Sequence, residues 1–149
     1  MALTVGTKAP VFTTTDDQGS TVSLSDFAGK IVVLYFYPKD DTPGCTKEAQ
    51  SFRDNYQEYQ EKDMVVLGVS TDDEASHKMF KEKYGLPFQL LADKDGSITK
   101  AYDVESLYNG QVYAQRVTYI IDAEGVITHV DTKVNTSTHA QDILTSIVS

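Results

Sequence analysis

Continuous apolar runs alternate along the chain with segments in which apolar residues recur every three or four positions. The runs IVVLYFY at 31–37 and MVVLGVS at 64–70 combine β-branched and aromatic residues, a pattern typical of strands buried on both faces of a sheet. Shorter apolar segments at 88–93, 116–122 and 126–131 are predicted as further strands. The last two are joined by a short loop that contains glycine, which predicts a hairpin.

Three other segments have the periodicity of amphipathic helices. From Thr46 to about Lys62, apolar side chains form one stripe, which consists of Ala49, Phe52, Tyr56 and Tyr59. Residues 72–85 begin with acidic residues and end with lysines and Gly85, as helices often do. Residues 138–148 complete the pattern. We therefore expect an α/β fold in which helices cover both faces of a mixed central sheet.

The composition is that of an ordinary globular protein, and it limits the partners. The chain has 149 residues, 40% hydrophobic and 23% charged, with a formal net charge of −9. This length favours a single domain over residues 1–149, and the negative charge argues against nucleic acid as a partner. One cysteine cannot form an intramolecular disulfide, which favours a reducing compartment. Since no apolar run could span a bilayer and no secretory leader is present, we expect a soluble, cytoplasmic protein.

The single cysteine, Cys45, lies in YPKDDTPGCTKEA, between the first long strand and the first long helix. Backbone N–H groups and the helix dipole stabilise negative charge at such a position, so the pKa of a thiol there can fall below the value of about 8.5 of a free thiol. Thr42 supplies a hydroxyl that could donate to the sulfur or to a substrate oxygen, while Pro43 and Gly44 shape the turn. A lone cysteine is more often a packing residue, but these neighbours favour a functional thiol.

The spacing Pro38-x-x-x-Thr42-x-x-Cys45 resembles the active-site motif of peroxiredoxins, which are thiol peroxidases. The surrounding segment YFYPKDDTPGCTKEA is similar to the branch called bacterioferritin comigratory protein or peroxiredoxin Q. Other segments match in the same order from about Val5 to the last helix, among them GTKAPVF, VVLGVSTDD, HKMFKEKYGLPFQLLAD and RVTYIIDAEGVITHV. The resemblance implies a thioredoxin-like fold and reduction of hydrogen peroxide and alkyl hydroperoxides.

The resemblance also implies a role for each residue of the motif. Cys45 would be the peroxidatic cysteine, whose thiolate attacks the hydroperoxide and becomes a sulfenic acid. Thr42 would bind peroxide and thiolate through its hydroxyl. Arg116 falls where the family carries its active-site arginine, and a guanidinium there would hold the thiolate and orient a peroxide oxygen. The alternative for Arg116 is an exposed residue at a strand edge. No metal, flavin or haem is needed.

Three more residues complete the expected site. Pro38 would shield the thiolate, and the backbone N–H groups of Gly44 and Cys45 would donate to the substrate. Glu48, one helical turn after Cys45, either orients the arginine or is a plain first-turn acid that suits the helix dipole.

One position departs from the familiar pattern of this branch. Many members carry a resolving cysteine five residues after the first, where this chain has Gln50, and others carry it in the next helix, here SHKMFKEKY. The sequence therefore predicts a one-cysteine mechanism. An external thiol, such as thioredoxin or glutathione with glutaredoxin, would resolve an exposed Cys45 sulfenic acid. We expect a monomer, with a weak homodimer as the alternative.

The remaining candidate residues favour structural roles. The histidines lack metal-ligand spacing and are interpreted as surface or packing residues: His77, His129 and His139. The acidic pair at 40–41 is interpreted as a solvated loop, and DKDG at 93–96 as a β-turn. The aromatic stretch at 102–113 is interpreted as irregular. It either anchors a loop onto the core, which is favoured, or lines the substrate entrance.

Two other classes of function fit this kind of fold. A disulfide oxidoreductase needs a Cys-x-x-Cys pair, but position 42 is threonine, and residues 116–122 contain no proline for the cis bond found opposite such sites. A catalytically silent binding module or holdase chaperone stays open from the sequence. The joint presence of the motif residues and Arg116 weighs against it.

Overall fold

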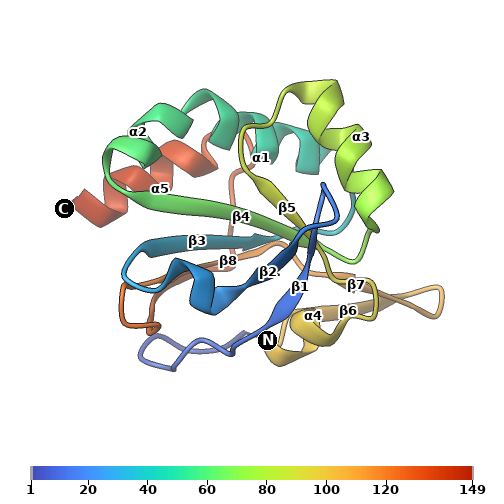
Figure 1. Cartoon of the computed structure of the whole chain (residues 1–149), viewed down its shortest axis with the longest axis horizontal. Coiled ribbons are helices and arrows are strands. Elements are labelled where there is room, and N and C mark those ends of the chain that lie inside the picture. The colour runs from blue at the N-terminus through green and yellow to red at the C-terminus, as the bar shows by residue number, and fades with distance from the viewer. Residues whose placement is uncertain (1, 149) are drawn as a thin grey trace.

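A mixed sheet of seven strands crosses the middle of the part of the chain that the structure describes (Figure 1). This computed structural model describes residues 2–148, and the side chains of residues 2–145. The strands, in order across the sheet, are β2 (Thr21–Ser23), β1 (Thr13–Asp16), β5 (Gln89–Ala92), β4 (Met64–Ser70), β3 (Ile31–Phe36), β8 (Val117–Ile121) and β9 (Ile127–Asp131). β3 is parallel to β4 and antiparallel to β8. The five strands predicted from apolar runs are all confirmed.

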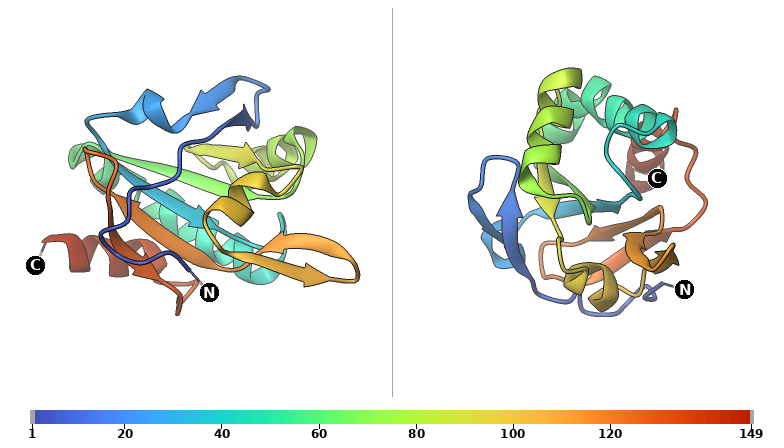
Figure 2. Two further views of the ribbon diagram at one scale, coloured as in Figure 1. Left: turned by 90° about the horizontal axis from the view of Figure 1, so that it is seen from below. Right: turned by 90° about the vertical axis from the view of Figure 1, so that its right-hand side faces the viewer.

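Alternate residues of β3 pack into two separate hydrophobic clusters, because successive side chains of a strand point to opposite faces. Val33 and Tyr35 face a layer formed by helices α1 (Pro43–Asp54), α2 (Tyr56–Glu61), α3 (Glu74–Tyr84) and α5 (His139–Val148). Leu34 and Phe36 face the other layer, which contains the 3-10 helix η1 (Leu24–Phe27) and the short helix α4 (Ser97–Ala101). Figure 2 shows the sheet between these layers. The predicted α/β architecture is confirmed, with the long helices gathered on one face.

The topology brings two distant segments together at one end of the sheet. Antiparallel pairing places Phe36, the last residue of β3, opposite Val117, the first residue of β8. The loop at 37–42, which leaves β3, and Arg116, which directly precedes β8, therefore lie at the same end of the sheet. α1 begins at this end as well, because it follows the loop directly.

The predicted single helix at 46–62 is wrong in one respect: the chain forms two helices, α1 and α2. The break lies at Asn55, whose side-chain amide donates to the carbonyl of Ser51 at 2.8 Å. An asparagine side chain that bonds to the backbone in this way competes with regular helical bonding. The apolar stripe is nevertheless on the buried face, with Phe52 and Tyr59 fully buried.

The predicted irregular stretch at 102–113 is also wrong, because it contains a hairpin. Strands β6 (Glu105–Tyr108) and β7 (Gln111–Ala114) pair as a separate two-stranded sheet that projects beyond the main sheet (Figures 1 and 2). Asn109 and Gly110 form its turn with φ values of 51° and 77°. Two successive positive φ angles are typical of a two-residue turn with this sequence.

Several other local predictions are confirmed. α3 starts after Asp73, which accepts a hydrogen bond from the Ser76 N–H, and ends at Gly85 in the left-handed region. The β8–β9 hairpin forms as expected, and DKDG makes a turn in which the Gly96 N–H donates to the carbonyl of Asp93. None of the helices in the described part of the chain has the length and apolar character needed to cross a membrane.

Candidate active site

Cys45 lies in the first turn of α1, where the chain has just left β3. Thr42 is the N-cap residue, and Pro43 occupies the first helical position, where a missing N–H costs nothing. The first N–H groups of an α-helix have no acceptor within it, so this helix end favours negative charge. The expectation of an exposed sulfur is wrong: only 1% of the Cys45 surface is accessible, and the residue belongs to the hydrophobic cluster under the helices.

Arg116 reaches the cysteine from the start of β8. Its Nη2 lies 3.4 Å from Cys45 Sγ, and its Nη1 donates to Glu48 Oε1 at 2.7 Å. A Cβ atom built on Gly44 would lie 3.0 Å from the same Nη2, so the absence of a side chain at Gly44 lets the guanidinium approach α1. The alternative of an exposed strand-edge arginine is therefore wrong. The structure brings Arg116, Cys45, Gly44 and Glu48 together as the sequence predicts.

Glu48 is a fully buried acid that holds the arginine. Burial raises its pKa to about 7, because the desolvation of the carboxylate outweighs the attraction of Arg116. Of the two interpretations of Glu48, the structure favours the one in which it orients the arginine. A plain first-turn acid would stay in water.

A buried histidine lies behind Glu48. His139, the first residue of α5, has Nε2 2.7 Å from Thr118 Oγ1 and 3.6 Å from Glu48 Oε2. Its Nδ1 lies 3.7 Å from Asp131 Oδ2. Burial lowers the pKa of His139 to about 4, so the ring is neutral at physiological pH. Among the described residues, Glu48 Oε2 and His139 Nδ1 are buried without a hydrogen-bond partner.

The Thr42 hydroxyl is engaged by a backbone carbonyl of the preceding loop. It donates to the carbonyl of Lys39 at 2.9 Å. A hydroxyl has one proton and two acceptor lone pairs. With its proton directed to Lys39, Thr42 Oγ1 presents an acceptor, whereas the sequence predicted that it donates to the sulfur or to a substrate oxygen.

The solvated-loop interpretation of residues 40–41 holds for Asp41 but is wrong for Asp40. Asp40 is buried, and its Oδ2 lies 2.7 Å from Nδ1 of His77, which is fully buried too. Only His129 of the three histidines is exposed; His77 and His139 each take part in a polar network beside the site. A sequence signal for His77 exists, since His77, Phe80 and Tyr84 share one face of α3 at helical spacing.

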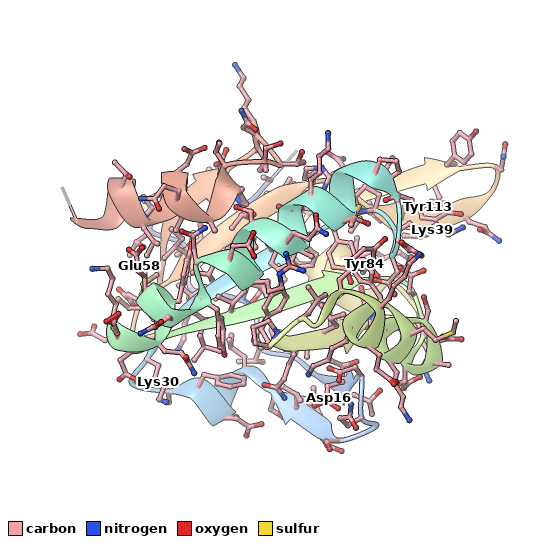
Figure 3. The ribbon with its side chains drawn as sticks, turned by 90° about the horizontal axis from the view of Figure 1, so that it is seen from above. Asp16, Lys30, Lys39, Glu58, Tyr84 and Tyr113 are labelled. Atoms are coloured by element: carbon pink, nitrogen blue, oxygen red, sulfur yellow. The ribbon has the colours of Figure 1, made fainter. Side chains whose placement is uncertain are left out.

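An apolar groove adjoins the loop at 37–42, called the motif loop below because it carries Pro38 and Thr42. It has a volume of about 420 Å³ and is lined by Pro38, Lys39, Ser106, Tyr108, Tyr113, Ala114 and Gln115. Figure 3 shows Lys39 and Tyr113 near the N-terminal end of α1. The groove thus lies between the motif loop and the β6–β7 hairpin, and Gln115 directly precedes Arg116. Tyr102, by contrast, is fully buried in the core, so the aromatic stretch supplies both a core anchor and a groove wall.

The chain is similar to proteins of one kind. The model of the AhpC/TSA family matches residues 5–130. A putative peroxiredoxin bcp from Coxiella burnetii is 48% identical over 148 residues, which are 97% of this chain and 98% of that protein. Peroxiredoxin Bcp from Bacillus subtilis is 44% identical over 151 residues, 99% of this chain and 96% of that protein. The crystal structure of peroxidoxin BcpB from Mycobacterium tuberculosis superimposes with a TM-score of 0.91 at 30% identity, covering 98% of this chain and 97% of that one.

Proposed function

The chain belongs to the AhpC/TSA family as a thiol peroxidase of the peroxiredoxin type, and from this premise we propose the role of each residue at its site. The observation that carries the assignment is the contact of Arg116 Nη2 with Cys45 Sγ at a helix N-terminus, with the other guanidinium nitrogen held by a buried Glu48. A fixed cation and a helix end lie at the sulfur, and a hydroxyl with a free acceptor site belongs to the N-cap of the same helix. This arrangement suits a reaction in which charge leaves sulfur and appears on oxygen.

The Cys45 thiolate attacks the terminal oxygen of a hydroperoxide. An S–O bond forms, the O–O bond breaks, and the departing oxygen takes a proton from solvent to leave as an alcohol or water. Sulfur is oxidised by two electrons to the sulfenic acid, and the peroxide is reduced by the same two. Arg116 stabilises the charge on sulfur and on the departing oxygen, and the N–H groups of Gly44 and Cys45 donate to the peroxide. Thr42 Oγ1 accepts the O–H of the peroxide and so aligns its terminal oxygen with the sulfur.

A second thiol must return the enzyme to its starting state. With one cysteine in the sequence, an external thiol attacks the Cys45 sulfenic acid, water leaves, and a mixed disulfide forms. A further thiol then releases the Cys45 thiol and an oxidised product. We propose thioredoxin, or glutathione with glutaredoxin, as the source of these thiols. The dependence on reduced thiols, together with one unpaired cysteine, supports the cytoplasm as the location. We propose a monomeric single domain as the working form.

The apolar groove supports organic hydroperoxides as substrates besides hydrogen peroxide. Pro38 shields the thiolate on one side, and the groove that Pro38 shares with Tyr113 offers an apolar surface for an alkyl group. A Tyr113→Ser variant should lose kcat/KM for cumene hydroperoxide several-fold more than for hydrogen peroxide. Leu107→Ser is the matched control, since Leu107 is 73% exposed on the same hairpin but does not line the groove. Equal losses for both substrates would contradict this subsite.

The activity itself is tested by following peroxide consumption with excess dithiothreitol. The protein should consume hydrogen peroxide catalytically, and Cys45→Ser should consume none above background. The alternative of a silent binding module or holdase chaperone predicts no difference between the two proteins. The high identity to peroxiredoxins over nearly the whole chain disfavours that alternative.

A further inference from the structure

The motif loop is fastened to α3 by a buried polar cluster centred on Asp40. Asp40 Oδ1 accepts from the Tyr37 hydroxyl at 2.6 Å, and Oδ2 accepts from the Ser76 hydroxyl at 2.8 Å. His77 Nδ1 lies 2.7 Å from the same Oδ2. The backbone N–H of Asp40 donates to Asp72 Oδ2 at 2.8 Å. Every hydrogen bond of this cluster ties the loop to residues that belong to, or flank, β3 and α3.

The partners of the His77 ring define its charge. Nε2 lies 2.8 Å from the carbonyl oxygen of Leu91, which can only accept, so Nε2 carries a hydrogen. Nδ1 faces Asp40, whose two oxygens already accept from two hydroxyls. Two hydroxyls and the His77 ring all face the two oxygens of Asp40, an arrangement that suits an acceptor-only carboxylate, and beside a carboxylate Nδ1 carries a hydrogen as well. The pair is a buried imidazolium and a buried carboxylate.

Three of the four groups that face His77 from its neighbours, Asp40, Asp72 and the Leu91 carbonyl, favour this state. Asp40 comes from the loop, Asp72 from the segment before α3, the Tyr37 hydroxyl from the end of β3, and the Leu91 carbonyl from β5. Burial lowers the pKa of His77, but the hydrogen bonds and charges of Asp40, Leu91 and Asp72 raise it above the ordinary value of 6.5. Asp40, Asp72 and His77 also have the composition of a metal site. The 2.7 Å hydrogen bond between Asp40 and His77 leaves no room for an ion between them.

Asp40 lies at the middle of the turn that presents the reacting groups. It stands two residues after Pro38 and two before Thr42, and the following Asp41 has a φ of 57°. A non-glycine residue in that region is held there by its surroundings. A buried ion pair is costly to desolvate and seldom adds net stability, so stability alone does not explain this one.

We propose that Asp40 and His77 are positioning residues of the peroxidase reaction: their charged pair fixes the turn between β3 and α1, and full turnover requires the protonated His77. The inference rests on the proposed function, because it assigns a part in that reaction. The inference also predicts how the rate of peroxide reduction changes with pH. The imidazolium predominates at and below pH 6.5 and is lost as pH rises through the raised pKa of His77. The rate constant for peroxide should therefore fall at alkaline pH, which gives the pH profile a basic limb.

The test compares two neutral replacements that each keep one donor of the ring. His77→Asn retains a donor on the side of Asp40, and His77→Gln retains one on the side of Leu91. His129→Gln is the matched control, since it removes the exposed histidine of β9. Reduced proteins are mixed with hydrogen peroxide in single turnover between pH 6 and 9.5, and circular dichroism and thermal unfolding confirm the fold. The charge of His77 is read in the unmodified protein from the side-chain ¹⁵N shifts by NMR.

We expect His77 to be mainly an imidazolium at pH 6.5 and its NMR midpoint to coincide with the basic limb of the rate. His77→Gln should react about tenfold to a hundredfold more slowly, the effect of misplacing a reacting group by about 1 Å, and should lack the limb. His77→Asn should retain more of the rate, and His129→Gln should keep both. A mainly neutral His77 at pH 6.5, or a folded His77→Gln with the full rate and an unchanged profile, would overturn the inference.

Two further outcomes are also decisive. If both replacements fail to fold, coincidence of the NMR midpoint with the basic limb of the unmodified protein supports the inference, and disagreement overturns it. If the unmodified protein does not reduce peroxide, the proposed function fails. The charge of His77, and the rate of Cys45 alkylation by iodoacetamide in His77→Gln against His129→Gln, then still decide whether the pair positions Cys45.

Discussion

Arg116 Nη2 lies 3.4 Å from Cys45 Sγ, although the two residues are 71 positions apart in the chain. The contact depends on the antiparallel register of β3 and β8, which places Phe36 opposite Val117, and on Glu48, which holds the other end of the guanidinium. The sulfur therefore meets its cation only in the folded sheet. The reactivity that we propose for Cys45 therefore depends on the tertiary structure more than on the motif.

Arg116→Ala should lower the second-order rate constant for hydrogen peroxide by about a hundredfold to a thousandfold, the usual effect of removing one preorganised donor. The protein should still fold, because Arg116 precedes β8 and is not part of its ladder. Stopped-flow single-turnover measurements give the rate. Lys47→Ala is the control, since it removes an exposed cation that lies in α1 two residues after Cys45. Equal losses in both variants would show that only the general field of positive charge matters.

Glu48→Gln should change how stability depends on pH. A glutamate ionises near pH 4.5 in the unfolded chain, but Glu48 does so at about pH 7 in the folded protein. Between these values the unfolded state releases its proton first, so the stability of the unmodified protein falls, by about 3 kcal/mol in the limit. Glutamine has no such proton. The free energy of unfolding of the variant, relative to the unmodified protein, should therefore rise from pH 4.5 to pH 7 and then level off.

Urea unfolding of the reduced proteins at several pH values measures this difference. Glu61→Gln provides the comparison, because it makes the same change at an exposed position at the end of α2. A difference that is independent of pH for Glu48→Gln would mean that the attraction of Arg116 offsets the burial of the Glu48 carboxylate, so that its pKa is the same in the folded and unfolded protein.

Thr42→Val should lower the rate for hydrogen peroxide by about tenfold or more, while Thr42→Ser should stay within about threefold of the unmodified protein. Valine keeps the volume but has neither the proton that bonds to Lys39 nor an acceptor for the peroxide. Serine keeps both. Single-turnover rates and thermal unfolding, measured together, separate chemistry from packing. Equal damage from both variants would show that the methyl group, and hence packing, is what Thr42 supplies.

The parts of the fold that were predicted from the sequence are those where burial is two-sided or periodic. The runs at 31–37 and 64–70 are apolar throughout because both faces of these central strands are covered. The threonine-rich strand β1 was missed, since an edge region with polar side chains has little apolar pattern. The β6–β7 hairpin was missed for the same reason: its Leu107 and Tyr108 are exposed.

The site was predictable as far as the motif reaches. The spacing of Pro38, Thr42 and Cys45 is local, and Arg116 followed from the family resemblance. Asp40 and His77 were not found, because nothing in a sequence shows that an acid in a loop will be buried against a histidine 37 positions away. Burial of a polar residue depends on the partners that the fold brings to it.

Oxidation of the unmodified protein should add a single oxygen to a monomer. One equivalent of peroxide should give a species that dimedone traps, with no intramolecular disulfide, because no second thiol exists. The buried position of Cys45 makes further oxidation to sulfinic acid slower than an exposed sulfur would allow. Intact-mass spectrometry over a series of peroxide concentrations follows both steps. An intramolecular sulfenamide, seen as loss of water from the sulfenic acid, would contradict the expected product.

Gln50→Cys tests the stability of the first turns of α1. Five residues along an α-helix correspond to a rise of about 7.5 Å and a rotation of about 140°, so the sulfurs at 45 and 50 face different ways and cannot bond while the helix is intact. A disulfide between them requires the turns from Pro43 to Gln50 to unwind. The buried side chains of Cys45, Glu48 and Ala49 oppose unwinding. The contacts of Arg116 with Cys45 and Glu48 oppose it as well.

We therefore expect Gln50→Cys to form the disulfide slowly, over minutes, and Gln50→Cys combined with Arg116→Ala to form it faster. Non-reducing peptide mapping after one equivalent of peroxide measures both rates. If Gln50→Cys closes the disulfide as fast as it is oxidised, this end of α1 opens readily, and the Arg116–Glu48 contact does not hold it closed.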